Sequence, residues 1–294
     1  GRRAFHVAAS DVAAMGGRVR AVLLAITAPP DWPVDELRGV VRGLHAASRR
    51  AGAALAGGNL AMGREVALTV SVLGDAPARP VLRSGARVGD DVWVTGTLGG
   101  AAFGLRLLMG ARSLSRGEPA RRRWRRPVAR LRAGEALAAA GIPTAMMDVS
   151  DGLAIDAGRL ARASHRRVVL EAARLPIARD LAALASGEAR ALVLAGGEDY
   201  ELLFTAAPRE RGALARARLG VAVTRIGTVA AGRGVSLVDA DGRRLQLPER
   251  AGHEQHSLAV SAEDDLFARR QAELRQHGDT ADRVLGCAIL GVRA

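Results

Sequence analysis

The segment MDVSDGL at residues 147–153 decides how the second half of this 294-residue chain folds. An apolar approach, a serine and an aspartate in a first turn predict a strand and then a helix capped by Ser150. The N–H groups at such a helix start can bind a phosphate, and Asp148 and Asp151 can hold Mg²⁺ against that phosphate. A plain capped helix with surface acids is the alternative interpretation.

A second acidic segment, GGEDYELLF at residues 196–204, lies between apolar runs. It places Glu198, Asp199 and Glu201 directly after a glycine pair. Carboxylates packed this closely repel one another unless cations neutralise them. A divalent metal with bound phosphate is the commonest reason to build such a site. The two segments together therefore indicate metal-dependent phosphate chemistry.

Hydrophobic periodicity around these segments predicts alternating helices and strands, typical of an α/β or α+β chain. The expected helices cover residues 4–15, 34–51, 100–109, 135–140, 151–164, 180–186 and 209–218. The expected strands cover residues 21–27, 66–73, 92–95, 168–170, 192–195, 202–205, 221–226 and 235–238. Residues 113–126 are expected to form a charged loop, with a phosphate-facing arginine as the alternative. The segment from residue 262 onward lacks a strand pattern and is interpreted as a tail or an appended helix.

The composition narrows the possible functions. Hydrophobic residues make up 49% of the chain, so a real core can form. The formal net charge of +13 invites a nucleic-acid-binding interpretation, but every basic residue is an arginine, which indicates a GC-rich coding bias. The 3% aromatic content is too low for a base-stacking platform, so we expect no nucleic-acid partner.

The cysteine content and the hydropathy of the chain indicate where in the cell the protein is located. The single cysteine, Cys287, excludes a disulfide framework or a cysteine-based zinc site within one chain. The apolar run at residues 21–28 is too short to span a membrane, and no signal-peptide pattern precedes it. We therefore expect a cytoplasmic protein without a membrane partner. The chain begins at Gly1 and enters a helix directly, so we expect that its natural N-terminus is missing.

Three further positions are candidates for the same chemistry. Asp11 shares a helix face with apolar residues, where a carboxylate needs a metal or a partner such as Arg18. The glycines of GGN at residues 57–59 let the backbone approach a ligand, although an ordinary turn explains them too. Arg83 precedes a tight turn and could contact phosphate, with a solvated surface position as the alternative. A Walker A loop is excluded because it needs lysine.

Together these pieces resemble one family. SDVAAMGG (10–17), GGN (57–59), RSGARVGD (83–90), DVSDGL (148–153) and GGEDYELLF (196–204) come in the order found in thiamine-monophosphate kinases. These kinases belong to the aminoimidazole ribonucleotide synthetase-like superfamily. The resemblance runs from Gly1 to about Gly252, and GGEDYELLF is its most specific part.

The resemblance implies a fold and a reaction. The reaction is ATP-dependent phosphorylation of thiamine monophosphate to thiamine diphosphate by direct in-line transfer, with Mg²⁺ as cofactor. The fold is the two-domain synthetase-like one, with an incomplete N-terminal sheet domain (1–76), a larger C-terminal α/β domain (77–260) and a tail (261–294). The assembly is a homodimer whose N-terminal sheets join into a barrel.

The resemblance also implies roles for individual residues. Asp148 and Asp151 resemble the catalytic residues. The implied ATP-binding residues are Gly58, Asn59, Arg83 and Ser150. The implied substrate-binding residues are Glu198 and Asp199. The implied metal ligands are Asp11, Asn59, Asp148 and Asp151.

Three departures from the family pattern keep an alternative open. A Gly-Asp-Asp segment that precedes this region in the family is absent, and Asn59 stands where the family has aspartate. The family's terminal Gly-Phe-Asp-His-Phe type of segment is replaced here by Gly252 and residues 253–255 without an aromatic. The alternative is a non-catalytic nucleotide-binding remnant of the same superfamily. A basic nucleic-acid binder is the third interpretation.

Overall fold

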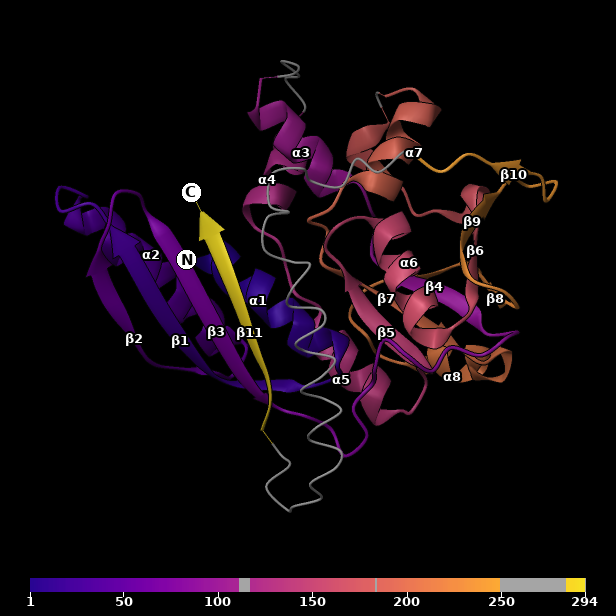
Figure 1. Ribbon diagram of the computed structural model, residues 1–294, viewed down its shortest axis with the longest axis horizontal. Coiled ribbons are helices and arrows are strands. Elements are labelled where there is room, and N and C mark those ends of the chain that lie inside the picture. The colour runs from indigo at the N-terminus through magenta and orange to yellow at the C-terminus, as the bar shows by residue number, and fades with distance from the viewer. Residues whose placement is uncertain (111–116, 183, 249–283, 294) are drawn as a thin grey trace.

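The chain forms two β-sheets with helices packed against them, and helix α1 lies between the two halves (Figure 1). The computed structural model describes residues 1–110, 117–182, 184–248 and 284–293. Both halves mix helices and strands, which confirms the predicted α/β class. The domain boundaries at residues 76 and 260 stay a prediction.

The N-terminal sheet has four strands in the order β11-β3-β1-β2. The strands are β1 (Arg18–Ala28), β2 (Ala54–Met62), β3 (Ala67–Asp75) and β11 (Val284–Arg293). Strand β1 pairs in parallel with β2 and antiparallel with β3, and β3 pairs antiparallel with β11. Alternation along β1 buries Val22 and Leu24 against α1 (Arg2–Ala14) and α2 (Val34–Arg50), while Leu23 and Ala25 face outward.

The C-terminal sheet has seven strands in the order β10-β9-β6-β8-β4-β7-β5. They are β4 (Asp91–Thr95), β5 (Ala145–Val149), β6 (Arg167–Glu171), β7 (Glu201–Ala206), β8 (Val223–Ala230), β9 (Gly234–Val238) and β10 (Arg244–Leu245). Neighbouring strands of this sheet pair antiparallel, except β6 and β9, which pair in parallel.

Helices cover both faces of this second sheet. The helices of this half of the chain are α3 (Gly100–Leu108), α4 (Glu118–Arg125), α5 (Leu131–Ala139), α6 (Leu153–Ser164), α7 (Ser186–Ala195) and α8 (Arg211–Arg216). Helices α3 and α4 pack with part of α7 in a separate core. One core joins α6 and α7 to one face, and another joins α5 and α8 to the other. Ala13 and Ala14 at the end of α1 belong to that second core, whereas Phe5 and Ala8 belong to the N-terminal core. Helix α1 therefore couples the two sheets and fixes the position of Asp11 between them.

Several sequence-based expectations are wrong in detail. Residues 113–126 contain helix α4, because arginine is a good helix former and Pro119 suits a first turn. The expected helix at 180–186 is wrong, because Arg179–Leu181 form a short 3-10 helix there and α7 begins at Ser186. The expected strand at 192–195 lies inside α7, whose apolar run packs on α6. A short apolar run cannot be assigned to strand or buried helix by periodicity alone.

Two further corrections concern strands. The GGN segment lies inside β2 rather than in a turn after a strand. Residues 284–293, expected to lack a strand, extend the N-terminal sheet as β11. The rest of the expected C-terminal segment lies outside the described residues. No helix in the described ranges combines the length and apolar character that crossing a bilayer requires.

Candidate functional site

The DVSDGL segment forms the predicted junction, but its helix begins later and is capped differently from the prediction. Strand β5 ends at Val149, and α6 begins at Leu153 with no side-chain cap from its N-cap residue, Gly152. The expectation that Ser150 caps the helix is therefore wrong. Asp156, from the first turn, reaches back instead, and its Oδ2 accepts the N–H groups of residues 150, 151 and 152 at 3.0, 3.0 and 3.2 Å. Those N–H groups were expected to face a phosphate.

The GGEDYELLF segment lies directly against this junction. The N–H of Glu198 donates to the carbonyl of Ser150 at 2.8 Å, and the N–H of Tyr200 donates to the carbonyl of Val149 at 2.9 Å. Gly197 permits the approach, since a Cβ there would lie 2.1 Å from the Ser150 oxygen. Glu198 adopts a φ of +74°, which is rare outside glycine. Two motifs far apart in the sequence thus form one structural unit.

A pair of carboxylates from different halves of the chain lies beside this unit. Asp148, at the end of β5, is buried and accepts a hydrogen bond from the Ser10 hydroxyl of α1 at 2.6 Å. Burial raises the pKa of the Asp148 carboxyl above its usual range, and the Ser10 bond opposes that rise. Asp11 follows Ser10 and reaches solvent. Desolvation by the surrounding protein, and then the charge of Asp148, raise the pKa of Asp11 to about 7.

Two more charged residues take part in this arrangement. The positive charge of Arg83 opposes the rise in the pKa of both Asp11 and Asp148, so Arg83 lies near the pair. Asp151 raises the pKa of Asp148 and forms an ion pair with Arg159, with Nη2 to Oδ2 at 2.5 Å. The structure therefore brings Asp11, Asp148, Asp151 and Arg83 into one neighbourhood, although their roles stay predictions.

These residues can supply some of the ligands of a Mg²⁺ ion, but not a complete set. Across the described part of the chain, no three Asp, Glu, His or Cys side chains are close enough together to hold one metal ion. A complete protein cage is therefore not formed by these residues. Mg²⁺, however, is usually bound through one or two carboxylates, with water and substrate phosphates as the other ligands. Burial raises the pKa of both Asp11 and Asp148, so their ionised forms are disfavoured, and a bound cation would stabilise them.

The candidate substrate residues have partners within the protein. Asp199 accepts the N–H groups of Gly99 and Ala101 at 2.7 and 3.2 Å, which holds the start of α3. Burial raises the pKa of Asp199 to about 7, and these two bonds oppose the rise. Glu198 pairs with Arg3 of α1 and accepts the Tyr200 hydroxyl at 2.8 Å. Of these two candidate substrate residues, only Glu198 thus lies where α1 and the GGEDYELLF segment meet.

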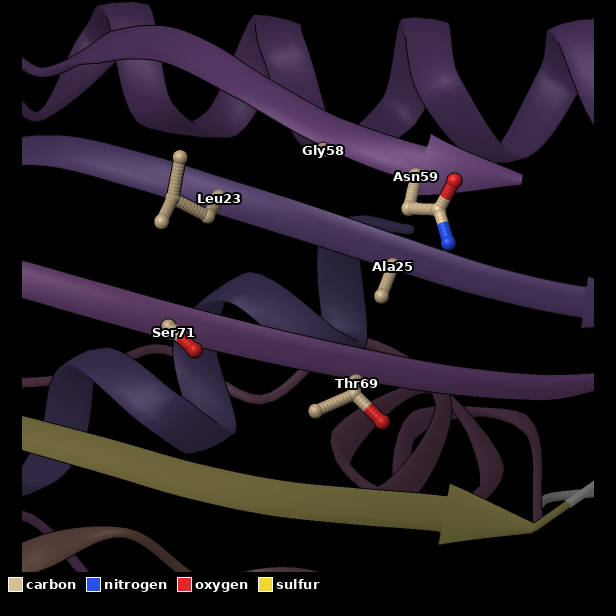
Figure 2. Close-up of a pocket in the computed structure, with 6 residues that line it drawn as sticks. All are labelled: Leu23, Ala25, Gly58, Asn59, Thr69 and Ser71. Carbon is tan, nitrogen blue, oxygen red and sulfur yellow. The ribbon is translucent and has the colours of Figure 1, made fainter. Parts of the chain in front are cut away.

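Asn59 and Gly58 lie elsewhere. Asn59 pairs in register with Ala25, on the outer face of the N-terminal sheet and opposite the face that α1 covers. Figure 2 shows Leu23, Ala25, Asn59, Thr69 and Ser71 lining an open hollow, with helices behind the sheet. A Cβ at Gly58 would lie 1.8 Å from the Leu24 oxygen, so this glycine allows β1 and β2 to pair. The structure does not bring Asn59 together with the other three candidate metal ligands.

Asp156, Arg159 and Ser10 were missed as contributors to the site. Asp156 lies between Leu153 and Leu160 on the buried face of α6. A carboxylate on an apolar helix face requires a partner. The same argument that singled out Asp11 would have found Asp156.

Comparison with known proteins identifies the family. Residues 1–76 match the N-terminal domain, and residues 87–240 the C-terminal domain, of AIR synthase related proteins. The thiamine-monophosphate kinase of Pyrococcus abyssi is 33% identical over 263 residues, covering 90% of this chain and 81% of that protein. This chain belongs to the thiamine-monophosphate kinase family.

The chain is also similar to a second kinase sequence and to a solved structure. The thiamine-monophosphate kinase of Mycobacterium tuberculosis (strain ATCC 25618 / H37Rv) is 38% identical over 208 residues, 69% of this chain and 62% of that protein. The structure of AaThiL complexed with AMPPCP and TMP has a TM-score of 0.73 and 31% identity, covering 84% of this chain and 77% of that one. The kinase fold therefore extends over both sheets described above.

Proposed function

We propose that this chain transfers the γ-phosphoryl group of ATP to thiamine monophosphate and forms thiamine diphosphate, with Mg²⁺ as cofactor. The observation that supports this most is the meeting of Asp11 and Asp148. They come from α1 and β5, and each carries a raised pKa. A related structure with an ATP analogue and TMP bound is consistent with both substrates.

The proposed mechanism is a direct in-line displacement. The attacking atom is a phosphate oxygen, which is largely ionised near neutral pH, so no protein group has to remove a proton. Asp11 and Asp148 would hold Mg²⁺, which when bound offsets the charge of the two phosphates. The charge of Arg83 acts on the same carboxylates, which supports its proposed contact with an ATP phosphate. Positioning and electrostatics then supply most of the rate.

Glu198 is the better of the two candidate substrate contacts. It lies where α1 meets the GGEDYELLF segment and forms an ion pair with Arg3. In this proposal both side chains rearrange around the bound substrate. Asp199 acts on the substrate indirectly in this proposal, because both its oxygens hold the start of α3. Ser150, which lies between the end of β5 and the start of α6, contacts ATP through its hydroxyl in this proposal.

We further propose that the protein is a homodimer through the outer face of the N-terminal sheet. Leu23 is 41% exposed there, beside Ala25, Thr69 and Ser71, none of which is charged. An uncharged sheet face of this kind can pack against a second sheet. Asn59 lies on the same face, so its proposed ligand role would depend on the partner subunit.

The alternative, nucleotide binding without catalysis, is favoured by the neutral Asn59 and its distance in the fold from α1. Formation of thiamine diphosphate decides between the two. Purified protein with ATP, Mg²⁺ and thiamine monophosphate should form thiamine diphosphate, detected by chromatography after oxidation to the fluorescent thiochrome derivative. Nucleotide binding without this product would contradict the kinase proposal. The cytoplasmic location and the lack of nucleic-acid or membrane partners stay predictions.

A further inference from the structure

One buried carboxylate controls the loop that carries the candidate metal ligands. Asp156 is 0% exposed and uses each of its oxygens for a different task. Its Oδ2 accepts three consecutive backbone N–H groups, those of residues 150–152. Its Oδ1 accepts Nη1 of Arg159 at 2.8 Å. A charged acceptor with this many donors fixes the local backbone strongly.

Arg159 extends the control to a side chain. While Nη1 binds Asp156, Nη2 binds Oδ2 of Asp151 at 2.5 Å. The guanidinium is a rigid planar fork, so the position of Asp156 sets the position of Asp151. One buried anion thereby determines both the backbone of the loop and the direction of one of its acidic side chains.

The opposite side of the loop is held as well. The Ser150 carbonyl accepts the Glu198 N–H, and the carbonyl of Val149 accepts the Tyr200 N–H. Asp148 directly precedes Val149 in β5. The loop is therefore clamped between Asp156 on the α6 side and the GGEDYELLF segment on the other, with both acidic side chains adjacent to the clamp.

We propose that Asp156 and Arg159 are positioning residues that, through the loop of residues 150–152, direct the Asp148 and Asp151 carboxylates toward a divalent cation. This inference rests on the proposed function. It also means that the α6 N-terminus binds an internal carboxylate rather than a substrate phosphate. The residues act through others, so they need not touch ATP or thiamine monophosphate.

The sharpest test is Arg159→Gln. Removal of a positive charge beside two carboxylates should strengthen cation binding if charge alone matters, because the cation meets less repulsion. Loss of positioning should weaken it, by on the order of 10- to 100-fold, the usual effect of removing a group that orients metal ligands. The two explanations thus predict opposite signs. The measurement is Mn²⁺ affinity of the substrate-free protein by electron paramagnetic resonance.

Asp156→Asn is the companion variant. Its amide oxygen can still accept the loop N–H groups, but its NH₂ group faces Arg159 and breaks that contact. It should weaken Mn²⁺ binding to a similar extent, and the double variant should be no worse than either single one. The matched controls are Asp35→Asn and Arg38→Gln, which break an exposed Asp–Arg pair of the same spacing on α2.

The outcomes separate this inference from the proposed function. Mn²⁺ binding and thiamine diphosphate formation by the wild type uphold the function, and weaker Mn²⁺ binding by Arg159→Gln with unchanged controls then upholds the positioning role. Equal or tighter binding by Arg159→Gln overturns the positioning role alone. A wild type that forms thiamine diphosphate but binds no Mn²⁺ without substrate overturns the positioning role alone, whereas a wild type that does neither overturns both. Circular dichroism confirms that each variant is folded.

Discussion

Replacement of Asp148 by asparagine should separate catalysis from stability. The residue is 7% exposed, and its carboxylate accepts a hydrogen bond from the Ser10 hydroxyl at 2.6 Å. A hydroxyl both donates and accepts, so it can turn to accept from the new NH₂ group. The substitution therefore keeps the shape of the site and removes the charge that couples to Asp11.

The two expected effects have opposite signs. Loss of one electrostatic stabiliser should lower kcat by about 10²- to 10³-fold, or about 2.7–4 kcal/mol. Burial raises the folded-state pKa of Asp148 above 3.8, so the ionised carboxylate opposes folding. The stability that its protonation contributes is complete below pH 3.8 and is lost as pH rises through the folded pKa. Each unit of that shift corresponds to about 1.4 kcal/mol.

The variant should consequently be nearly inactive yet melt at a higher temperature than the metal-free wild type at pH 8. Thiamine diphosphate formation measures the first effect, and thermal unfolding in a chelator measures the second. Asp35→Asn, on the exposed surface of α2, serves as the control for loss of one carboxylate. Wild-type turnover would refute the assigned role of Asp148. A lower melting temperature would refute the electrostatic argument about stability.

Other substitutions probe the remaining features. Gly197→Ala should abolish turnover, because its Cβ would lie 2.1 Å from the Ser150 oxygen, whereas Gly187→Ala, with open space around it, should retain activity. Leu23→Arg should convert the proposed dimer to monomers in light scattering, and an unchanged mass would exclude this sheet face as the interface. Burial raises the pKa of Asp199 to about 7, so the stability from its protonation is complete below pH 3.8 and lost as pH rises through 7. Asp199→Asn should flatten that part of the pH–stability curve for metal-free protein, and an unchanged curve would contradict the shifted pKa.

Local sequence determined the elements and the order of the motifs. The strands at 21–27, 66–73 and 92–95 follow from their apolar pattern, and the structure has β1, β3 and β4 there. The acidic segments and their order were sufficient to indicate the family, because short motifs with a chemical function can be recognised in the sequence without knowledge of the fold. The spacing also marked Asp11 as an unusual carboxylate on an apolar helix face.

Tertiary contacts decided the parts that local pattern leaves open. Helix α7 forms where a strand was expected because its apolar residues find α6 as a partner, a fact that a window of sequence does not contain. The cap of α6 is Asp156 rather than Ser150, since packing of α6 buries this first-turn carboxylate, which then accepts the N–H groups of residues 150–152.

The sequence by itself predicted only part of the site. The meeting of Asp11 with Asp148 requires α1 to pack across both cores, which depends on long-range burial. The separation of Asn59 from them depends on which face of β2 is buried, and pairing register with β1 sets that face. Sequence determined which groups could carry the chemistry, whereas packing between distant segments decided which of them meet, because contact energies come from neighbours that the chain supplies only once it is folded.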